Sequence, residues 1–471
     1  MTMKRHIKII TAIALLIVLL PACEKWIDPE LNVDPDRPLD VPMNLLLPAI
    51  QAPMAYDIGG NDAVRITGIL MQHLDGVGRQ SLAQAHYNIN NSDPNNLWNG
   101  IYSGEMYDLI TLIKKAGEQE SPQWAGIAKI MLANCMGFTT DLFGNVPYSE
   151  AFLGTGNFAP VFDSQESIYT AIIGLLDDGL ADLDKENAVP LSGDMIYGGS
   201  IAKWKKAGNA LKARYLMHQV NVNASVKGQI AALVDASFTG NSEDMQFQYG
   251  PNGSTEASPL YQFMEQRAGD ITMCATLVDF LQASTDPRLP VYAQKDAVGL
   301  YRGSPAGAAD ESASLPNPEG IYWKADGITT FISYVEAQFL KAEALLGTDN
   351  AGAAAAYKLA VEASLNKHGV FDQTWFDANI GIETEATINI TKIRQQKWVA
   401  MFSQTEVWND WRRSNNEIGL DLAQDELLGQ IPYSYPYPAD EQTLNPNCPQ
   451  GRDLIRKMWW MGTANPSPAK K

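Results

Sequence analysis

Residues 331–367 have the sequence FISYVEAQFLKAEALLGTDNAGAAAAYKLAVEASLNK, and this stretch decides the fold. Its first half places Val335, Phe339 and Ala342 at i, i+4 and i+7, which is the spacing of one face of a helix. Gly347 follows the last apolar residue and is a typical helix stop. The pattern therefore predicts an amphipathic helix over 331–346.

The second half of the stretch predicts a partner helix over 352–367. Tyr357, Val361 and Leu365 form its apolar stripe, and a run of alanines before them lets two helices pack closely. Two amphipathic helices with a short join form a helical hairpin that is similar to a tetratricopeptide unit. The chain shows no strict 34-residue period, so any repeats are degenerate.

Helical patterns also dominate the rest of the chain, which predicts an all-α protein. We expect further helices over 43–57, 61–75, 97–116, 123–138, 164–185, 203–222, 226–236, 271–283 and 389–412. Long segments rich in Gly, Pro, Ser and Asn separate these helices, and in compact proteins such segments are more often functional than idle. They cover residues 76–96, 144–161, 239–259, 285–327 and 430–451.

The N-terminus has the pattern of a lipoprotein signal. Three basic residues precede an apolar run over 9–20, which is much shorter than the roughly 20 residues of a membrane-spanning helix. A small residue and then Cys23 end the run. We therefore expect a signal peptide over 1–22, a lipidated Cys23, an extended tether over 23–42 and a single helical domain over 43–471.

Charge and composition exclude several classes of protein. The formal charge is −19, and it becomes −22 when the three cations of the signal peptide are removed. This acidity argues against nucleic acid as a partner, because nucleic acids are bound by basic patches. No second long apolar run is present.

Motifs for catalysis or metal binding are absent from the sequence. It contains no GxSxG, HExxH or GxxxxGK(S/T) pattern, and no CxxC pair. Cys135, Cys274 and Cys448 are therefore expected to be buried apolar residues. Convergence of His73 and His86 on a shared site is less expected than solvated or capping roles. We expect no enzyme activity, no metal site and no cofactor.

Residues 392–413 combine tryptophans with charges. The apolar side chains keep one helical face: they are Trp398, Met401, Phe402, Trp408 and Trp411. One interpretation is a binding site, and the favoured one is a partly buried ion-pair network that fixes this helix to its neighbours. In that network we expect Arg412 to pair with Glu406 or Asp410.

Seven segments, in their order and spacing, resemble the SusD-like (SusD/RagB) family of outer-membrane nutrient-binding lipoproteins. They are residues 32–35 (NVDP), 44–49 (NLLLPA), 141–151 (DLFGNVPYSEA), 286–289 (DPRL), 334–343 (YVEAQFLKAE), 396–398 (QKW) with Trp408, Arg412 and Arg413, and 435–438 (YPYP) with Glu441 and Asn445. The resemblance covers essentially the whole chain.

The resemblance implies a helical scaffold of four tetratricopeptide-like helix pairs that supports irregular loops. It implies a lipid-anchored protein on the outside of the outer membrane that caps a TonB-dependent SusC-like transporter and captures oligosaccharides, or sometimes peptides, without catalysis. The matched segments are scaffold, so no binding residue is carried over from the family.

The ligand site is predicted from chemistry. Sugar rings stack on aromatic faces, while Asp, Asn and Arg side chains satisfy the hydroxyls. Two loops carry this mixture, and the expected contact residues are Asp75, Arg79, Tyr87, Tyr301, Arg302, Tyr322 and Trp323. Core packing is expected for Trp98 and Tyr102. Peptide binding, a surface glycosidase with an unrecognised carboxylate pair, and an adhesive lipoprotein remain alternatives.

Overall fold

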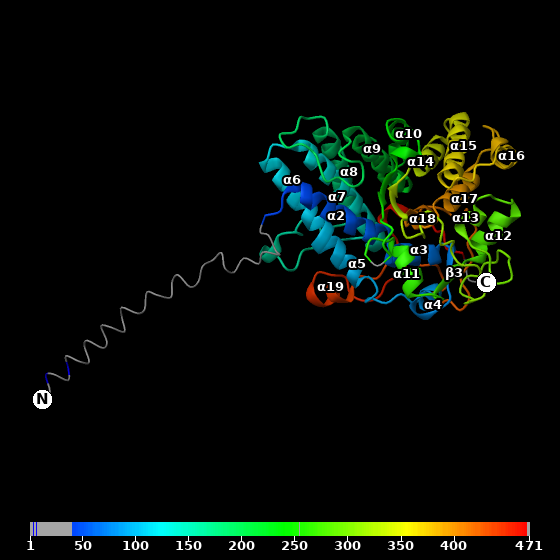
Figure 1. The fold of residues 1–471 in the computed structure, drawn as a ribbon, viewed down its shortest axis with the longest axis horizontal. Coiled ribbons are helices and arrows are strands. Elements are labelled where there is room, and N and C mark those ends of the chain that lie inside the picture. Colours follow the sequence, from blue (N-terminus) through cyan, green and yellow to red (C-terminus); the bar gives the residue numbers. More distant parts are fainter. Residues whose placement is uncertain (1–2, 4–5, 7–39, 254, 469–471) are drawn as a thin grey trace.

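The computed structural model describes Met3, His6 and residues 40–253 and 255–468. A row of long helices runs across the molecule, from α6 and α2 through α7, α8, α9 and α10 to α14 and α15 (Figure 1). Shorter helices, long loops and strand β3 lie beneath this row, and the described residues form two small two-stranded sheets. The lipidation predicted at Cys23 and most of the predicted tether lie outside the described residues.

The helical content confirms the predicted all-α fold class. The longer helices are α2 (Met43–Gly59), α3 (Asn61–Leu70), α6 (Tyr107–Glu118), α7 (Pro122–Phe143), α8 (Gln165–Asp182), α9 (Ile201–His218), α10 (Lys227–Asp235), α12 (Ala275–Ala283), α14 (Tyr334–Leu345), α15 (Asn350–Lys367) and α17 (Ile390–Ala400). The short ones include α4 (Arg79–Ala85), α5 (Asn95–Asn99), α11 (Pro259–Gln266), α13 (Leu289–Tyr292), α16 (Gln373–Phe376), α18 (Glu406–Arg412), α19 (Ala439–Leu444) and the π-helices η3 (Gly100–Met106) and η8 (Asp377–Gly381).

The predicted helical hairpin is present as α14 and α15. Each helix begins at a capping side chain: Ser333 Oγ accepts a hydrogen bond from the Glu336 amide at 3.1 Å, and Asp349 Oδ1 accepts one from the Gly352 amide at 2.9 Å. The two predicted apolar stripes meet in one buried cluster, in which Phe339 packs on Tyr357 with ring centroids 6.4 Å apart.

Strands and turns interrupt several of the predicted helices. Residues 271–273 and 331–332, expected to be helical, lie in strands β3 (Ile271–Met273) and β4 (Ile328–Ile332). Strand β3 pairs with β1 (Leu74–Gly76), and β4 pairs with β2 (Met245–Gln248), both antiparallel. The partners are distant in sequence, so helical periodicity gives no sign of them. The helix predicted over 389–412 is broken into α17 and α18 at a turn in which Ser403 has a φ of 61°.

Glycines set how closely the long helices pack. A Cβ atom at Gly126 on α7 would lie 2.8 Å from the Gly179 carbonyl oxygen on α8, and one at Gly137 would lie 2.2 Å from the Tyr215 ring on α9. Real Cβ atoms do not approach a backbone oxygen so closely, so the α7–α8 crossing requires glycine at position 126, while a side chain at position 137 would require the Tyr215 ring to move.

Two apolar clusters hold the chain together. The larger one includes side chains from α2 to residue 461, and the smaller one fills the space between α14, α15, η8 and α17. Cys135, Cys274 and Cys448 are buried free thiols, as predicted. Among residues 40–253 and 255–468, no helix is long and apolar enough to cross a membrane. The domain boundaries given above stay a prediction.

The α7–α8 crossing yields a stability test. Gly126→Ala is expected to lower the free energy of unfolding by about 1–3 kcal/mol, because the added methyl group meets backbone that cannot move aside. Gly174→Ala on α8 is the matched control, since no atom lies within 4 Å of its Cβ position. That change is expected to raise stability by about 0.5–1 kcal/mol through helix propensity. Urea unfolding measures both, and equal effects would contradict the close crossing.

Candidate functional site

Asp75 joins the two loops predicted to bind the ligand. Its side chain is 1% exposed, and its carboxylate accepts hydrogen bonds from Ser304 Oγ at 2.6 Å and from the Gly307 amide at 2.8 Å. Burial raises the pKa of Asp75, although these hydrogen bonds oppose the shift. The first loop, which carries Asp75 and Arg79, is therefore fixed against residues 304–307 of the second loop, which carries Tyr301 and Arg302. Asp75 acts as a clamp between the loops, and both of its oxygens are already engaged within the protein.

Three of the predicted residues reach the surface beside this clamp. Arg79 is half exposed, its Nε lies 2.6 Å from Asp270 Oδ1, and its Nη2 donates to the Ala268 carbonyl at 3.2 Å. Arg302 is exposed and pairs with Asp296. Tyr301 is half-buried, and the Lys295 ammonium lies 5.7 Å from its ring centroid. The second loop thus offers the Tyr301 ring beside Lys295, with Arg302 next to it in sequence, and Arg79 is at the surface of the first loop.

We expected the ligand-contacting rings to be exposed on loops, and for Tyr87, Tyr322 and Trp323 that expectation is wrong. Their exposed fractions are 2%, 3% and 2%. Each ring fills the core under its loop, and protein groups satisfy each polar atom: the Tyr87 hydroxyl accepts from the Ala423 amide, and Trp323 Nε1 donates to Ser403 Oγ at 2.9 Å. The ligand contacts proposed for these three rings stay predictions, and replacing Trp323 would open a core cavity and so confound a binding test.

A surface hollow of about 440 Å³ gathers more aromatic rings than the predicted loops do. We call it the aromatic hollow, and its lining includes Trp98, Asn99, Tyr102, Ser103, Tyr107, Phe152, Phe158 and Glu441. Trp98 is 4% exposed, as expected for a core residue. Tyr102 is only partly buried and lines the hollow. Sequence reasoning missed this place, although Phe152 and Phe158 lie in a loop segment singled out by its composition.

A second hollow, of about 710 Å³, lies between α2 and the segment around β2. Tyr56 and Tyr249 line it together with the side-chain amides of Gln248 and Gln262. The Tyr249 hydroxyl is 3.0 Å from Thr329 Oγ1, which fixes that ring, while Tyr56 is 53% exposed.

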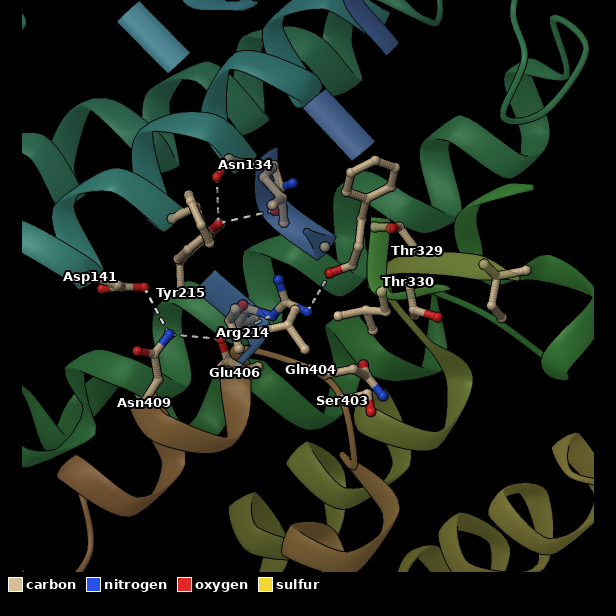
Figure 2. Close-up of a pocket in the computed structure, with 18 residues that line it drawn as sticks. Asn134, Asp141, Arg214, Tyr215, Thr329, Thr330, Ser403, Gln404, Glu406 and Asn409 are labelled. Atoms are coloured by element: carbon tan, nitrogen blue, oxygen red, sulfur yellow. Dashed lines mark hydrogen bonds and ion pairs between the residues drawn. The ribbon is translucent and has the colours of Figure 1, made fainter. Parts of the chain in front are cut away.

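The tryptophan and charge segment at 392–413 lies in the core. Trp398, Trp408 and Trp411 are at most 2% exposed. Glu406 at the start of α18 lies 2.6 Å from His218 Nε2. It also lies beside Arg214, with 3.8 Å between Oε2 and Nε (Figure 2). The cavity beside these side chains has a volume of about 30 Å³, which is room for about one water molecule. Its size favours the structural interpretation of this segment over a ligand site.

The predicted pairing of Arg412 is wrong. Its guanidinium lies 3.8 Å from the Trp408 ring centroid and 5.1 Å from that of Trp460, and its Nη1 donates to the Tyr433 carbonyl at 2.7 Å. Arg413 pairs with Asp410 instead, with 2.6 Å between Nη2 and Oδ1. The planar guanidinium of Arg412 lies between the two tryptophan rings and does not take part in the ion-pair network. Arg412 and Arg413 are adjacent in sequence, so the sequence does not show which of the two forms the ion pair.

His218 is enclosed between two carboxylates, Asp141 and Glu406, which together with it have the composition of a metal site. Both ring nitrogens are already engaged, because Nδ1 lies 2.7 Å from the Tyr169 hydroxyl and Nε2 lies 2.6 Å from Glu406. Burial alone would lower the pKa of His218, but the two carboxylates outweigh it and raise the pKa to about 9. A protonated imidazole beside Arg214 disfavours a bound cation, so the cluster acts as a buried ion-pair network.

Comparisons with known proteins place this geometry in context. The family model for SusD-like proteins, described as starch-binding and associating with the outer membrane, matches residues 35–438. A solved SusD/RagB family protein from Bacteroides thetaiotaomicron is 24% identical and has a TM-score of 0.76, covering 90% of this chain and 100% of that chain. A search of curated protein sequences found no match.

A chitin-binding SusD homologue from Flavobacterium johnsoniae is 20% identical to this chain. Its TM-score is 0.75, and the match covers 89% of this chain and 99% of that chain. Both solved structures share the helical fold of this chain.

The buried imidazolium predicts a loss of stability at alkaline pH. Because the pKa of His218 rises from about 6.5 unfolded to about 9 folded, its stabilisation is complete below about pH 6.5 and disappears as the pH rises through 9. Urea unfolding between pH 6.5 and 9.5 should show about 3 kcal/mol of this loss in wild type. His218→Gln, which is less stable throughout, should lack that component. Parallel pH profiles for the two proteins would contradict a charged His218.

Proposed function

The chain belongs to the SusD-like family, and from that premise we propose that it is a glycan-binding lipoprotein of the outer membrane. The family is described as starch-binding, and a structural neighbour is described as chitin-binding. Both ligands are glycans built from pyranose rings. This makes an oligosaccharide the first ligand class to test, with a peptide as the alternative.

The observation that carries the proposal is the clamp at Asp75. It fixes two loops, distant in sequence, side by side, and it leaves Arg79, Tyr301 and Arg302 at the surface of the pair. A half-buried ring held among fixed polar side chains is suited to stack on a sugar while its neighbours bind hydroxyl groups. We assign ligand capture to this surface.

Binding without catalysis fits the placement of the charged residues. The acidic groups of the buried network are paired with arginines, lysines or His218, so they hold the scaffold together and are closed to a substrate. We therefore propose no enzyme activity. A TonB-dependent SusC-like transporter is the proposed partner, to which the protein would deliver its ligand from the outer face of the membrane.

Lipidation of Cys23 is proposed to anchor the protein. The tether over 23–42 would then separate the anchor from the helical domain. Cys23→Ala is expected to move the protein from the membrane fraction to the soluble fraction, because acyl chains supply the attachment. Fractionation of cells that express each form measures this. Two results together would contradict the lipid anchor. They are a variant that stays in the membrane fraction, and a wild type whose processing is unchanged by a globomycin-type inhibitor of lipoprotein processing.

Tyr301→Ala tests the proposed ligand surface. Losing a stacked ring is expected to weaken binding about tenfold, while Tyr301→Phe keeps the ring and should keep most of the affinity. Titration calorimetry with maltohexaose and with chitohexaose measures both variants against wild type. Equal affinity in all three proteins would remove Tyr301 from the site, and product released from either sugar by pure wild type would contradict the binding-only function.

A further inference from the structure

The aromatic hollow is built around a short stack of rings. Trp98 and Tyr102 have ring centroids 4.6 Å apart, and Tyr102 and Phe152 are stacked at 5.9 Å with 19° between their planes. Tyr107 is 47% exposed and Phe158 is 77% exposed, so two further rings of the lining face solvent. Clustered exposed aromatic rings around a concave surface are uncommon in soluble proteins, and they indicate a site of contact with a ligand or partner.

Two uncommon backbone conformations place these rings. Tyr102 lies on the π-helix η3, and Phe152 has a φ of 64°, in the left-handed region that large side chains rarely occupy. π-Helical turns occur frequently at functional sites, and strained residues persist where the surrounding structure holds them. The Tyr102 hydroxyl donates to the Pro147 carbonyl at 2.8 Å, which fixes the ring against the loop that carries Phe152.

The polar part of the lining suits hydroxyl groups. Asn99 contributes a side-chain amide, Ser103 a hydroxyl group and Glu441 a carboxylate. Glu441 Oε1 accepts a hydrogen bond from Asn445 Nδ2 at 2.8 Å, which fixes the carboxyl group at the edge of the hollow. Amide, hydroxyl and carboxyl groups beside aromatic faces are the combination that holds a pyranose ring.

Charge separates this hollow from the loop surface at Tyr301. Glu441 is the charged residue of the lining, and no Lys or Arg of the described residues lines the hollow. The Tyr301 surface, in contrast, carries Lys295 and Arg302. A carboxylate without a cationic neighbour in the lining repels an anionic sugar. We propose that the aromatic hollow is a second glycan-binding site, selective for neutral pyranosides over acidic ones.

The ligand class of this second site rests on the proposed function, but its residues differ from those of the Tyr301 surface. Trisaccharides are the probes, since each is short enough for one molecule to fill one site. Maltotriose and chitotriose are neutral, and trigalacturonate is the acidic counterpart. Titration calorimetry of the full-length protein gives the stoichiometry, and wild type should bind two neutral trisaccharides per chain.

Phe158→Ala and Tyr107→Ala test the hollow directly. Each removes an exposed ring, so folding should be unaffected, and each should weaken one of the two neutral sites about tenfold. Tyr56→Ala is the matched control, because Tyr56 is similarly exposed but lines the second hollow. That control should leave both sites intact, and Tyr301→Ala should weaken only the other site.

Glu441→Gln tests selectivity. Removing the carboxylate charge should raise the affinity of the hollow for trigalacturonate severalfold at low salt, with little change for maltotriose. An unchanged acidic affinity would overturn the selectivity, and unchanged neutral binding in both ring variants would overturn the site. If Tyr301→Ala alone then abolished binding, the proposed function would stand without the hollow. If wild type bound no sugar, the proposed function would fall as well.

Discussion

Arg214 makes the contact on which the rest of the structure depends. Its guanidinium makes a bidentate ion pair with Glu336, in which Nε lies 2.6 Å from Oε1, and it lies close to Glu406. These three residues come from α9, α14 and α18, so one buried charge joins elements that are far apart in sequence. A second group of pairs, with Arg413 between Glu343 and Asp410, extends the network. Removing one partner of a buried pair costs about 3–5 kcal/mol, which makes this arrangement hard to alter.

That network is the reason why we propose a ligand site at the surface. The carboxylates of this network face cations, and the cavity drawn beside them in Figure 2 is about the size of a water molecule. Catalysis or metal binding there would require breaking the pairs. The surface at Tyr301 and the aromatic hollow lie outside this network. Contacts with the protein hold rings at these places, as the hydrogen bond from the Tyr102 hydroxyl to the Pro147 carbonyl does, and this limits the entropy lost when a ligand binds.

The sequence was sufficient to predict features set by neighbouring residues, and insufficient to predict contacts between segments that are far apart in the chain. Apolar periodicity located the hairpin of α14 and α15, because Phe339 and Tyr357 belong to stripes set by helix geometry. It did not locate β3 and β4, whose partners lie far along the chain. Position in a loop does not show whether a side chain is exposed, so Trp323 was expected to contact a ligand although its ring is buried. The aromatic hollow escaped prediction because its rings come from two separate segments, 98–107 and 152–158, that only the fold brings together.

We propose that the surface loops and the aromatic hollow capture glycans, while the charged core only supports these surfaces. Hydrogen–deuterium exchange of the full-length protein, with and without maltohexaose, tests it most directly. We expect slower exchange over residues 295–303, 98–107 and 150–158 when the sugar is present, with exchange in α18 unchanged. Protection confined to α18 and to the end of α9 would contradict it, because the ligand would then act at the buried network.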